Sequence, residues 1–372
     1  MQHEPPDRRW PTEVARALVL VAAILALLRL SVPQAFYIDH VQPMQGWRYH
    51  LILVIFNLEA QAGWIAAALL PLVAVDMRPG APRGVALLAA ILTGVMLLGV
   101  LENLVLWLPG VYDHVLDAAL AGPPAVLALL DLALLPLSVM HWAGLLALIL
   151  ALCRVGQSRG VALAALAATL AVMALVLLRA EPGFSSATQG KGLALIVAAL
   201  WLWLVLRRPG ALPSGAQPWL AALMITLLLA EAVSILPQII SALQIHTLSG
   251  RATAIRAVLE AHHYGTALGD FPQTLLILLA LHQVGWARGP SPRWVWPLAL
   301  GVALGLVLPL VAQNMGGAGS FSAALDSLRT GASGPVAGAL GLIGGALGML
   351  VYPALALLAV WLVRQPLERR AA

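Results

Sequence analysis

The chain has 372 residues, of which 61% are hydrophobic and only 10% are charged, and its mean hydropathy is +0.91. Soluble domains carry roughly 25% charged residues, so this composition excludes a water-soluble globular protein and indicates that lipid is the solvent. The net charge of +5 does not indicate nucleic-acid binding, because the arginines fall in short groups between apolar runs, and the single cysteine excludes an internal disulfide framework.

A helix needs about 20 apolar residues to cross a bilayer core, and on this criterion the sequence predicts about ten spans. They lie near residues 14–30, 46–72, 84–108, 125–152, 161–178, 192–206, 218–243, 265–284, 294–311 and 335–363. Each run is longer than a strand and lacks strict alternation, which favours helices over a barrel. The expected fold is an all-α integral membrane bundle that forms a single transmembrane domain over residues 1–372.

The distribution of Lys and Arg predicts the orientation of the bundle. Fourteen of these 21 residues lie at one set of span ends, and seven lie at the other. Because cytoplasmic loops carry the excess of Lys and Arg, we expect a bacterial-type inner-membrane protein with both termini in the cytoplasm. No small-residue cleavage site follows the first span, so no removable signal peptide is predicted.

The connections on the outer side hold most of the polar side chains, so we expect any chemistry there. The connections 31–45, 109–124 and 244–261 contain Asp, His or Glu, whereas the inner ones are short and built from Arg, Pro and Gly. The segment 316–334 is rich in Gly and Ser, and residues 321–326 within it predict a short interfacial helix.

Several carboxyl groups fall inside predicted spans. Glu59 and Glu231 lie about halfway across, while Glu102 and Asp270 lie within roughly two turns of the outer surface. A carboxyl group at the midplane is costly unless it is paired or wetted. The matched depth of Glu59 and Glu231 predicts a shared water-filled path or proton relay. The alternative for each is a neutral acid bonded to a backbone carbonyl.

Two further patterns lie within spans. His50, Val54, Asn57 and Gln61 share one helix face, away from Glu59, and this stripe fits either the edge of a flat ligand such as a haem or packing against a neighbouring helix. In the last span, the pairs Gly341/Gly345 and Gly344/Gly348 have the small-xxx-small spacing. That spacing predicts close helix packing, with room for a planar cofactor as the alternative.

Two adjacent histidines, His262 and His263, stand at the mouth of the span 265–284. Imidazole ligands suit copper, iron or zinc, so the pair is a candidate metal site. The alternative is that the two histidines lie at the membrane interface and their polar rings contact water at the end of a helix. The sequence contains no Gly-rich phosphate loop, zinc-type His/Cys spacing or serine nucleophile elbow.

Arg48-Tyr49-His50 at the start of the second span, with Pro71 ending that run, resembles the catalytic subunit of the heme-copper superfamily, in particular cbb-type oxidases and nitric oxide reductases. In that family the histidine at this place ligates the low-spin haem. His262-His263-Tyr264 is similar to the family's copper-ligand pair before the eighth helix. The resemblance therefore implies haem at His50 and a metal site at His262 and His263.

The sequence departs from the family pattern at two places. Lys191 stands where the family has the third imidazole ligand, and the tenth span opens with 333–341, which contains no histidine. A protonated ammonium has no lone pair and cannot ligate a metal. We therefore expect copper to be absent, and Lys191 to meet an outer-side carboxylate such as Glu260 or Asp270.

Two functions of different class follow. The first is a haem-binding redox or accessory subunit, with His50 as axial ligand and His141 as the other candidate within a span, working in the bilayer with other membrane or cytochrome subunits. The alternative is a cofactor-free permease-like or scaffolding protein, in which Glu59 and Glu231 line a path or pack.

Overall fold

The computed structural model describes residues 10–31, 47–76, 83–106, 218–220, 222–223, 226, 266–286 and 291–367. Within these ranges all regular structure is helical: α1 (Trp10–Ser31), α3 (Trp47–Asp76), α4 (Arg83–Leu106), α11 (Thr266–Gly285), α12 (Val295–Asn314), α13 (Phe321–Arg329) and α14 (Pro335–Arg364). The all-α prediction is confirmed for this part of the chain. Six predicted spans coincide with α1, α3, α4, α11, α12 and α14. The other four lie outside the described residues, apart from positions 218–220, 222–223 and 226, so the count of ten stays a prediction.

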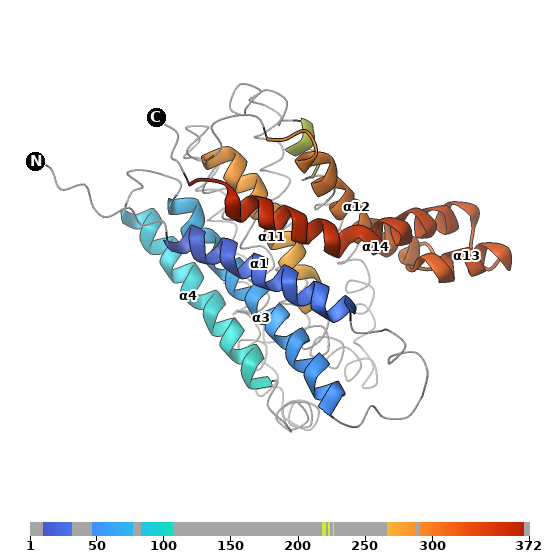
Figure 1. Ribbon diagram of the computed structural model, residues 1–372, viewed down its shortest axis with the longest axis horizontal. Coiled ribbons are helices and arrows are strands. Elements are labelled where there is room, and N and C mark those ends of the chain that lie inside the picture. Colours follow the sequence, from blue (N-terminus) through green and yellow to red (C-terminus); the bar gives the residue numbers. More distant parts are fainter. Residues whose placement is uncertain are drawn as a thin grey trace, which may run out of the picture.

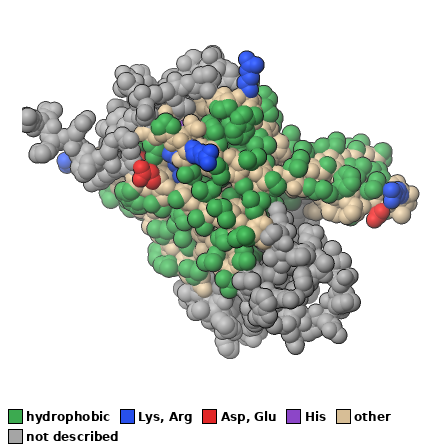
Figure 2. Space-filling model, viewed as in Figure 1, with side chains coloured by type: hydrophobic (Ala, Val, Ile, Leu, Met, Phe, Trp, Pro, Cys, Tyr) green, Lys and Arg blue, Asp and Glu red, His purple; other side chains and the backbone are tan. Residues whose placement is uncertain are grey.

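Among the described residues, four helical stretches are long and apolar enough to cross a membrane: Trp10–Leu28, Val54–Asp76, Val295–Gln313 and Pro335–Arg364. Apolar side chains cover most of the described surface in Figure 2. On α14, Val336, Ile343, Leu350 and Leu357 are each at least half exposed and recur every seven residues along one face. A continuous apolar face of this length is suited to lipid contact and indicates a membrane protein.

Helix α3 is the centre of the N-terminal part of the bundle and packs against α1, α4 and α11 (Figure 1). Trp64 and Leu70 are fully buried in it, and residues on all its sides are buried between positions 59 and 71. A helix that is apolar all round belongs in an interior, which explains its central place.

Pro71 does not end this helix, so that part of the sequence interpretation is wrong. Helix α3 continues through Pro71 to Asp76. A proline removes one backbone hydrogen bond and crowds the preceding turn, which ends many helices in water. Here Leu70, Val73 and Ala74 are buried on both sides of Pro71, and packing by neighbouring helices preserves the helix.

Close approaches between helices occur where one partner is glycine. A Cβ on Gly63 of α3 would lie 2.6 Å from the Cβ of Phe271 on α11. A Cβ on Gly305 of α12 would lie 2.7 Å from a methyl of Val351 on α14, and one on Gly344 would lie 2.8 Å from Pro309 of α12. The two interhelical contacts therefore depend on missing side chains.

Helix α13 packs antiparallel along the first turns of α14. Phe321 lies against Gly345, Ala324 against Gly341, and Leu328 against Gly338. The segment 317–320 therefore runs toward the C-terminal end of α14. The chain then reverses, and α13 runs toward the N-terminal end of α14. Close packing, one of the two interpretations of the glycine spacing, is confirmed at Gly341, Gly344 and Gly345, because neighbouring atoms occupy the space beside them.

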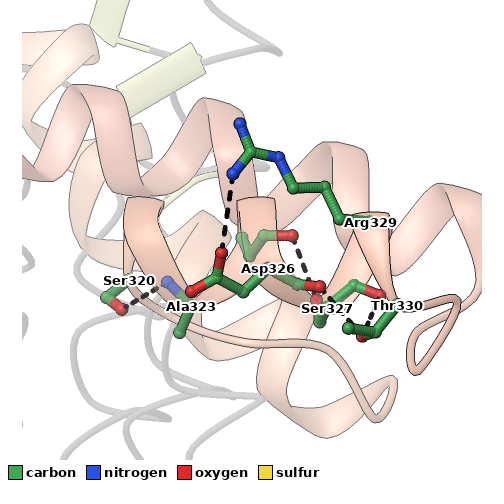
Figure 3. Close-up of polar contacts among 7 residues, drawn as sticks. Ser320, Ala323, Asp326, Ser327, Arg329 and Thr330 are labelled. Carbon is green, nitrogen blue, oxygen red and sulfur yellow. Dashed lines mark hydrogen bonds and ion pairs between the residues drawn. The ribbon is translucent and has the colours of Figure 1, made fainter.

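Local hydrogen bonds define both ends of α13 (Figure 3). The Ser320 hydroxyl accepts from the Ala323 backbone N–H at 3.4 Å. It is an N-cap, because the first backbone N–H groups of a helix have no acceptor within the helix. At the other end, the Thr330 N–H and hydroxyl both donate to the Asp326 carbonyl, and Gly331 takes a φ of 67° that ends the helix. The predicted short helix is therefore present and extends to Arg329.

The C-terminal helices form an arm. Helices α12 and α14 pack together, and with α13 they extend beyond the other described helices (Figure 1). Helix α14 contacts α1, and Arg16 of α1 bonds to Leu362 and Gln365, so the arm is attached to the rest of the bundle at the C-terminal end of α14.

Two glycines one turn apart on α12 allow a matched test of this packing. An added Cβ meets α14 at Gly305 and nothing within 4 Å at Gly301. We expect Gly305→Ala to lower the thermal unfolding midpoint in detergent, because overpacking costs roughly 1–3 kcal/mol and outweighs the gain of about 1 kcal/mol in helix propensity. Gly301→Ala should leave the midpoint unchanged or raise it. Equal effects of the two substitutions would contradict the packing described.

Candidate functional site

The predicted site residues fall partly within the described helices. His50 and Glu59 lie on α3, Glu102 on α4 and Asp270 on α11. Among these four, the structure describes the side-chain surroundings of Glu59. The remaining predicted site residues lie outside the described residues: His141, Lys191, Glu231, His262 and His263.

Glu59 is a buried carboxyl group near the middle of α3. It is 2% exposed and precedes Gly63 by one helical turn. Residues four apart share a helix face, so Glu59 lies on the side of α3 that meets α11 at Phe271. A carboxyl group in an apolar interior needs compensation and is a functional candidate by default.

The amides of the polar stripe on α3 bond to each other. The Gln61 side-chain N–H₂ donates to the Asn57 side-chain carbonyl at 3.3 Å. Gln61 is 7% exposed, whereas Val54, one turn before Asn57, is 53% exposed. The stripe therefore passes from an exposed position near His50 into the protein interior.

A second polar cluster, which we call the α1–α14 joint, consists of Thr12, Arg16, Asp76 and the end of α14. Arg16 is 5% exposed, and its guanidinium donates to the carbonyls of Leu362 and of Gln365, the latter at 2.7 Å. The last carbonyls of a helix lack intrahelical partners and carry a partial negative charge, so a cation there is stabilising. The Thr12 hydroxyl donates to the Asp76 carboxylate at 2.8 Å and ties α1 to α3.

Aromatic side chains continue the joint toward α11 and α12. The ring of Trp361 on α14 meets His282 of α11 at 6.0 Å and Trp294 at 6.3 Å, both edge to face. Edge-to-face pairs of this separation add about 0.5–1.5 kcal/mol beyond burial. The joint thus connects α1, α3, α11, α12 and α14 at one end of the bundle.

These contacts establish the relative directions of the helices. The joint gathers the N-terminal ends of α1 and α12 with the C-terminal ends of α3, α11 and α14. Helices α3 and α11 therefore run parallel and touch at Gly63 and Phe271. His50, in the first turn of α3, belongs to the opposite end of the bundle from the joint, whereas Asp270 precedes Phe271, which meets Gly63 near the middle of α3.

Several buried donors at the joint end have no hydrogen-bond partner in the described structure. Atoms without a hydrogen-bond partner in the described structure include Arg16 Nε, Gln283 Nε2, and the indole nitrogens of Trp286 and Trp296. Buried polar groups are normally bonded, and atoms of this kind also occur in the middle of the bundle, at the Trp64 indole nitrogen and the Thr93 hydroxyl.

Sequence reasoning treated Arg16 as one of many topology-setting charges and missed its structural role. Helix α1 begins at Trp10 rather than near position 14, which places Arg16 seven residues into the helix. The available signal was an arginine inside an apolar helix, where a charge requires a partner. Its partners, Leu362 and Gln365, cannot be identified from helix periodicity.

In the part of the chain that the structure describes, no three His, Cys, Asp or Glu side chains are grouped so that they could hold a metal ion. Comparisons with protein-family models, curated proteins and solved structures found no match to this chain.

The Thr12–Asp76 bond offers a test of the joint. Thr12→Val keeps the side-chain shape but removes the hydroxyl donor from a buried carboxylate, which costs about 1–3 kcal/mol. We expect a lower thermal unfolding midpoint for Thr12→Val and a near-normal one for Thr12→Ser, which retains a hydroxyl. A normal midpoint for Thr12→Val would show that this bond does not stabilise the joint.

Proposed function

We propose that the protein is an inner-membrane haem-binding redox or accessory subunit, a divergent relative of the heme-copper oxidase catalytic subunit that has lost most metal ligands. One observation supports this above the others. Helices α3 and α11 are parallel neighbours, with His50 in the first turn of α3. The motif His262-His263-Tyr264 ends two residues before Thr266, where α11 begins. In sequence, one family-like motif thus begins α3 and the other directly precedes α11, and these two helices run parallel and touch.

We propose a ten-span topology with both ends of the chain in the cytoplasm. The α1–α14 joint supports it, because Arg16 near the start of α1 bonds to Gln365 just after α14. The directions of α1, α3, α11, α12 and α14 agree with an alternating arrangement in which they are the first, second, eighth, ninth and tenth spans. The excess of arginine on the joint side then makes this side cytoplasmic.

The proposed haem is held by His50 from α3, with the stripe through Val54, Asn57 and Gln61 leading from that ligand into the bundle. A bound haem supplies one-electron redox chemistry. The tenth span offers no second axial histidine, so His141 is the remaining candidate, and five-coordinate binding to His50 is the alternative. Copper is proposed to be absent, because Lys191 replaces the third imidazole ligand.

A cofactor-free permease-like or scaffolding role is the second candidate. Two observations favour it: Glu59 is buried on the α3 face that meets α11, and the glycine crossings of α14 are closed by neighbouring atoms. In this alternative Glu59 and Glu231 line a path or pack within the bundle.

Optical spectroscopy of the purified protein separates the two candidates. The haem proposal predicts a Soret band that His50→Ala removes, because the variant lacks the axial imidazole. His282→Phe is the control: it exchanges a histidine of the joint for another aromatic side chain and should retain the band. The absence of a Soret band from haem-supplemented protein, or its persistence in His50→Ala, would contradict the assignment.

Reporter fusions test the topology. A reporter fused after residue 372 should be active on the cytoplasmic side, and one inserted within 244–261 should be active on the outer side, because α11 crosses between them with the arginine-rich joint inside. Reporters on the same side would refute the ten-span arrangement.

A further inference from the structure

The exposed face of α14 changes character at its C-terminal end. Leu357, Val360 and Val363 are exposed apolar residues, and the next residue, Arg364, is an exposed cation. Such a step from apolar to cationic side chains is typical of the boundary between acyl chains and lipid headgroups.

Tryptophan and a second arginine lie beside this boundary. Trp294 is 46% exposed and contacts the ring of Trp361, which lies one helical turn before Arg364. Arg293, also exposed, precedes Trp294. Tryptophan prefers the headgroup level, where its ring is apolar and its N–H meets polar groups. Four side chains from α14 and the start of α12 thus share one interfacial region.

The charges around this region favour an anion. At the joint itself, the charges of Arg16 and Asp76 offset each other. Glu13, in the first turn of α1, is the exposed acid on the helix that packs against α14. Counted against Arg293 and Arg364, its one negative charge leaves a net charge of +1 among these three exposed residues.

We propose that Arg293, Trp294, Trp361 and Arg364 form a binding site for an anionic phospholipid. The headgroup phosphate meets the two arginines, and an acyl chain follows the exposed stripe through Val360 and Leu357. Each arginine near a membrane surface strengthens binding of an anionic lipid about fivefold. The assignment to the cytoplasmic leaflet rests on the proposed topology, whereas the preference for an anionic headgroup does not.

Lipid titration of the purified full-length chain tests the site. In neutral detergent, phosphatidylglycerol should raise the thermal unfolding midpoint, whereas phosphatidylcholine at the same concentration and inorganic phosphate should have little effect. Arg293→Gln with Arg364→Gln should weaken the apparent affinity for phosphatidylglycerol by about 25-fold, because two arginines are lost. Arg293→Lys with Arg364→Lys, which keeps both charges and guards against a folding defect, should retain most of the effect.

Arg329→Gln is the matched control, because Arg329 is an exposed arginine of α13 at the other end of α14. It should leave the lipid effect unchanged. An equal response to phosphatidylcholine, or full phosphatidylglycerol affinity in the double Gln variant, would overturn the proposal. A detergent micelle does not separate a cytoplasmic side from an outer side. The outcomes of the lipid titration are therefore independent of the reporter fusions that test the topology.

Discussion

A buried guanidinium joins the first described helix to the last. Burying a charge in an apolar interior costs several kcal/mol unless its donors are satisfied. Arg16 finds its acceptors in the carbonyls of Leu362, in the last turn of α14, and of Gln365, just after it, where a helix has few backbone donors left to offer. The start of α1 and the end of α14 must therefore lie at the same level. The aromatic contacts of Trp361 extend this constraint to α11 and α12.

The two ends of α14 are held by opposite means. At the joint, large polar and aromatic side chains fill the space and supply hydrogen bonds. At the other end Gly338, Gly341 and Gly345 let α13 and the segment before it approach the backbone of α14. The polar backbone of 317–320 is tolerated because it lies against protein rather than bare lipid.

Much of the fold is predictable because bilayer thickness determines the length of each apolar run. The spans at 14–30 and 335–363 match α1 and α14 closely, and the small-residue spacing predicted the glycine contacts because it places glycines on one face. Pro71 was misjudged because burial, which local sequence does not report, keeps α3 intact. The antiparallel course of α13 was not predictable either, since an amphipathic pattern identifies an apolar face but not its partner.

The candidate site was predictable only within single helices. Periodicity placed His50, Asn57 and Gln61 on one face, and the Gln61–Asn57 hydrogen bond agrees with that face. It could not supply a second ligand for His50 or the partners of Arg16, because these depend on which helices become neighbours. Arg16 and Leu362 are 346 positions apart in the sequence, so only the folded chain shows that they are bonded.

The joint requires the start of α1 and the end of α14 to lie at the same level, and pulsed electron paramagnetic resonance can measure the distance between them directly. In a Cys153→Ala background, spin labels at Glu13→Cys and Arg364→Cys should lie well within the hydrocarbon thickness of about 30 Å, and labels at Glu13→Cys and Arg329→Cys should be separated by about that thickness or more. A separation between positions 13 and 364 greater than roughly 30 Å would contradict the account.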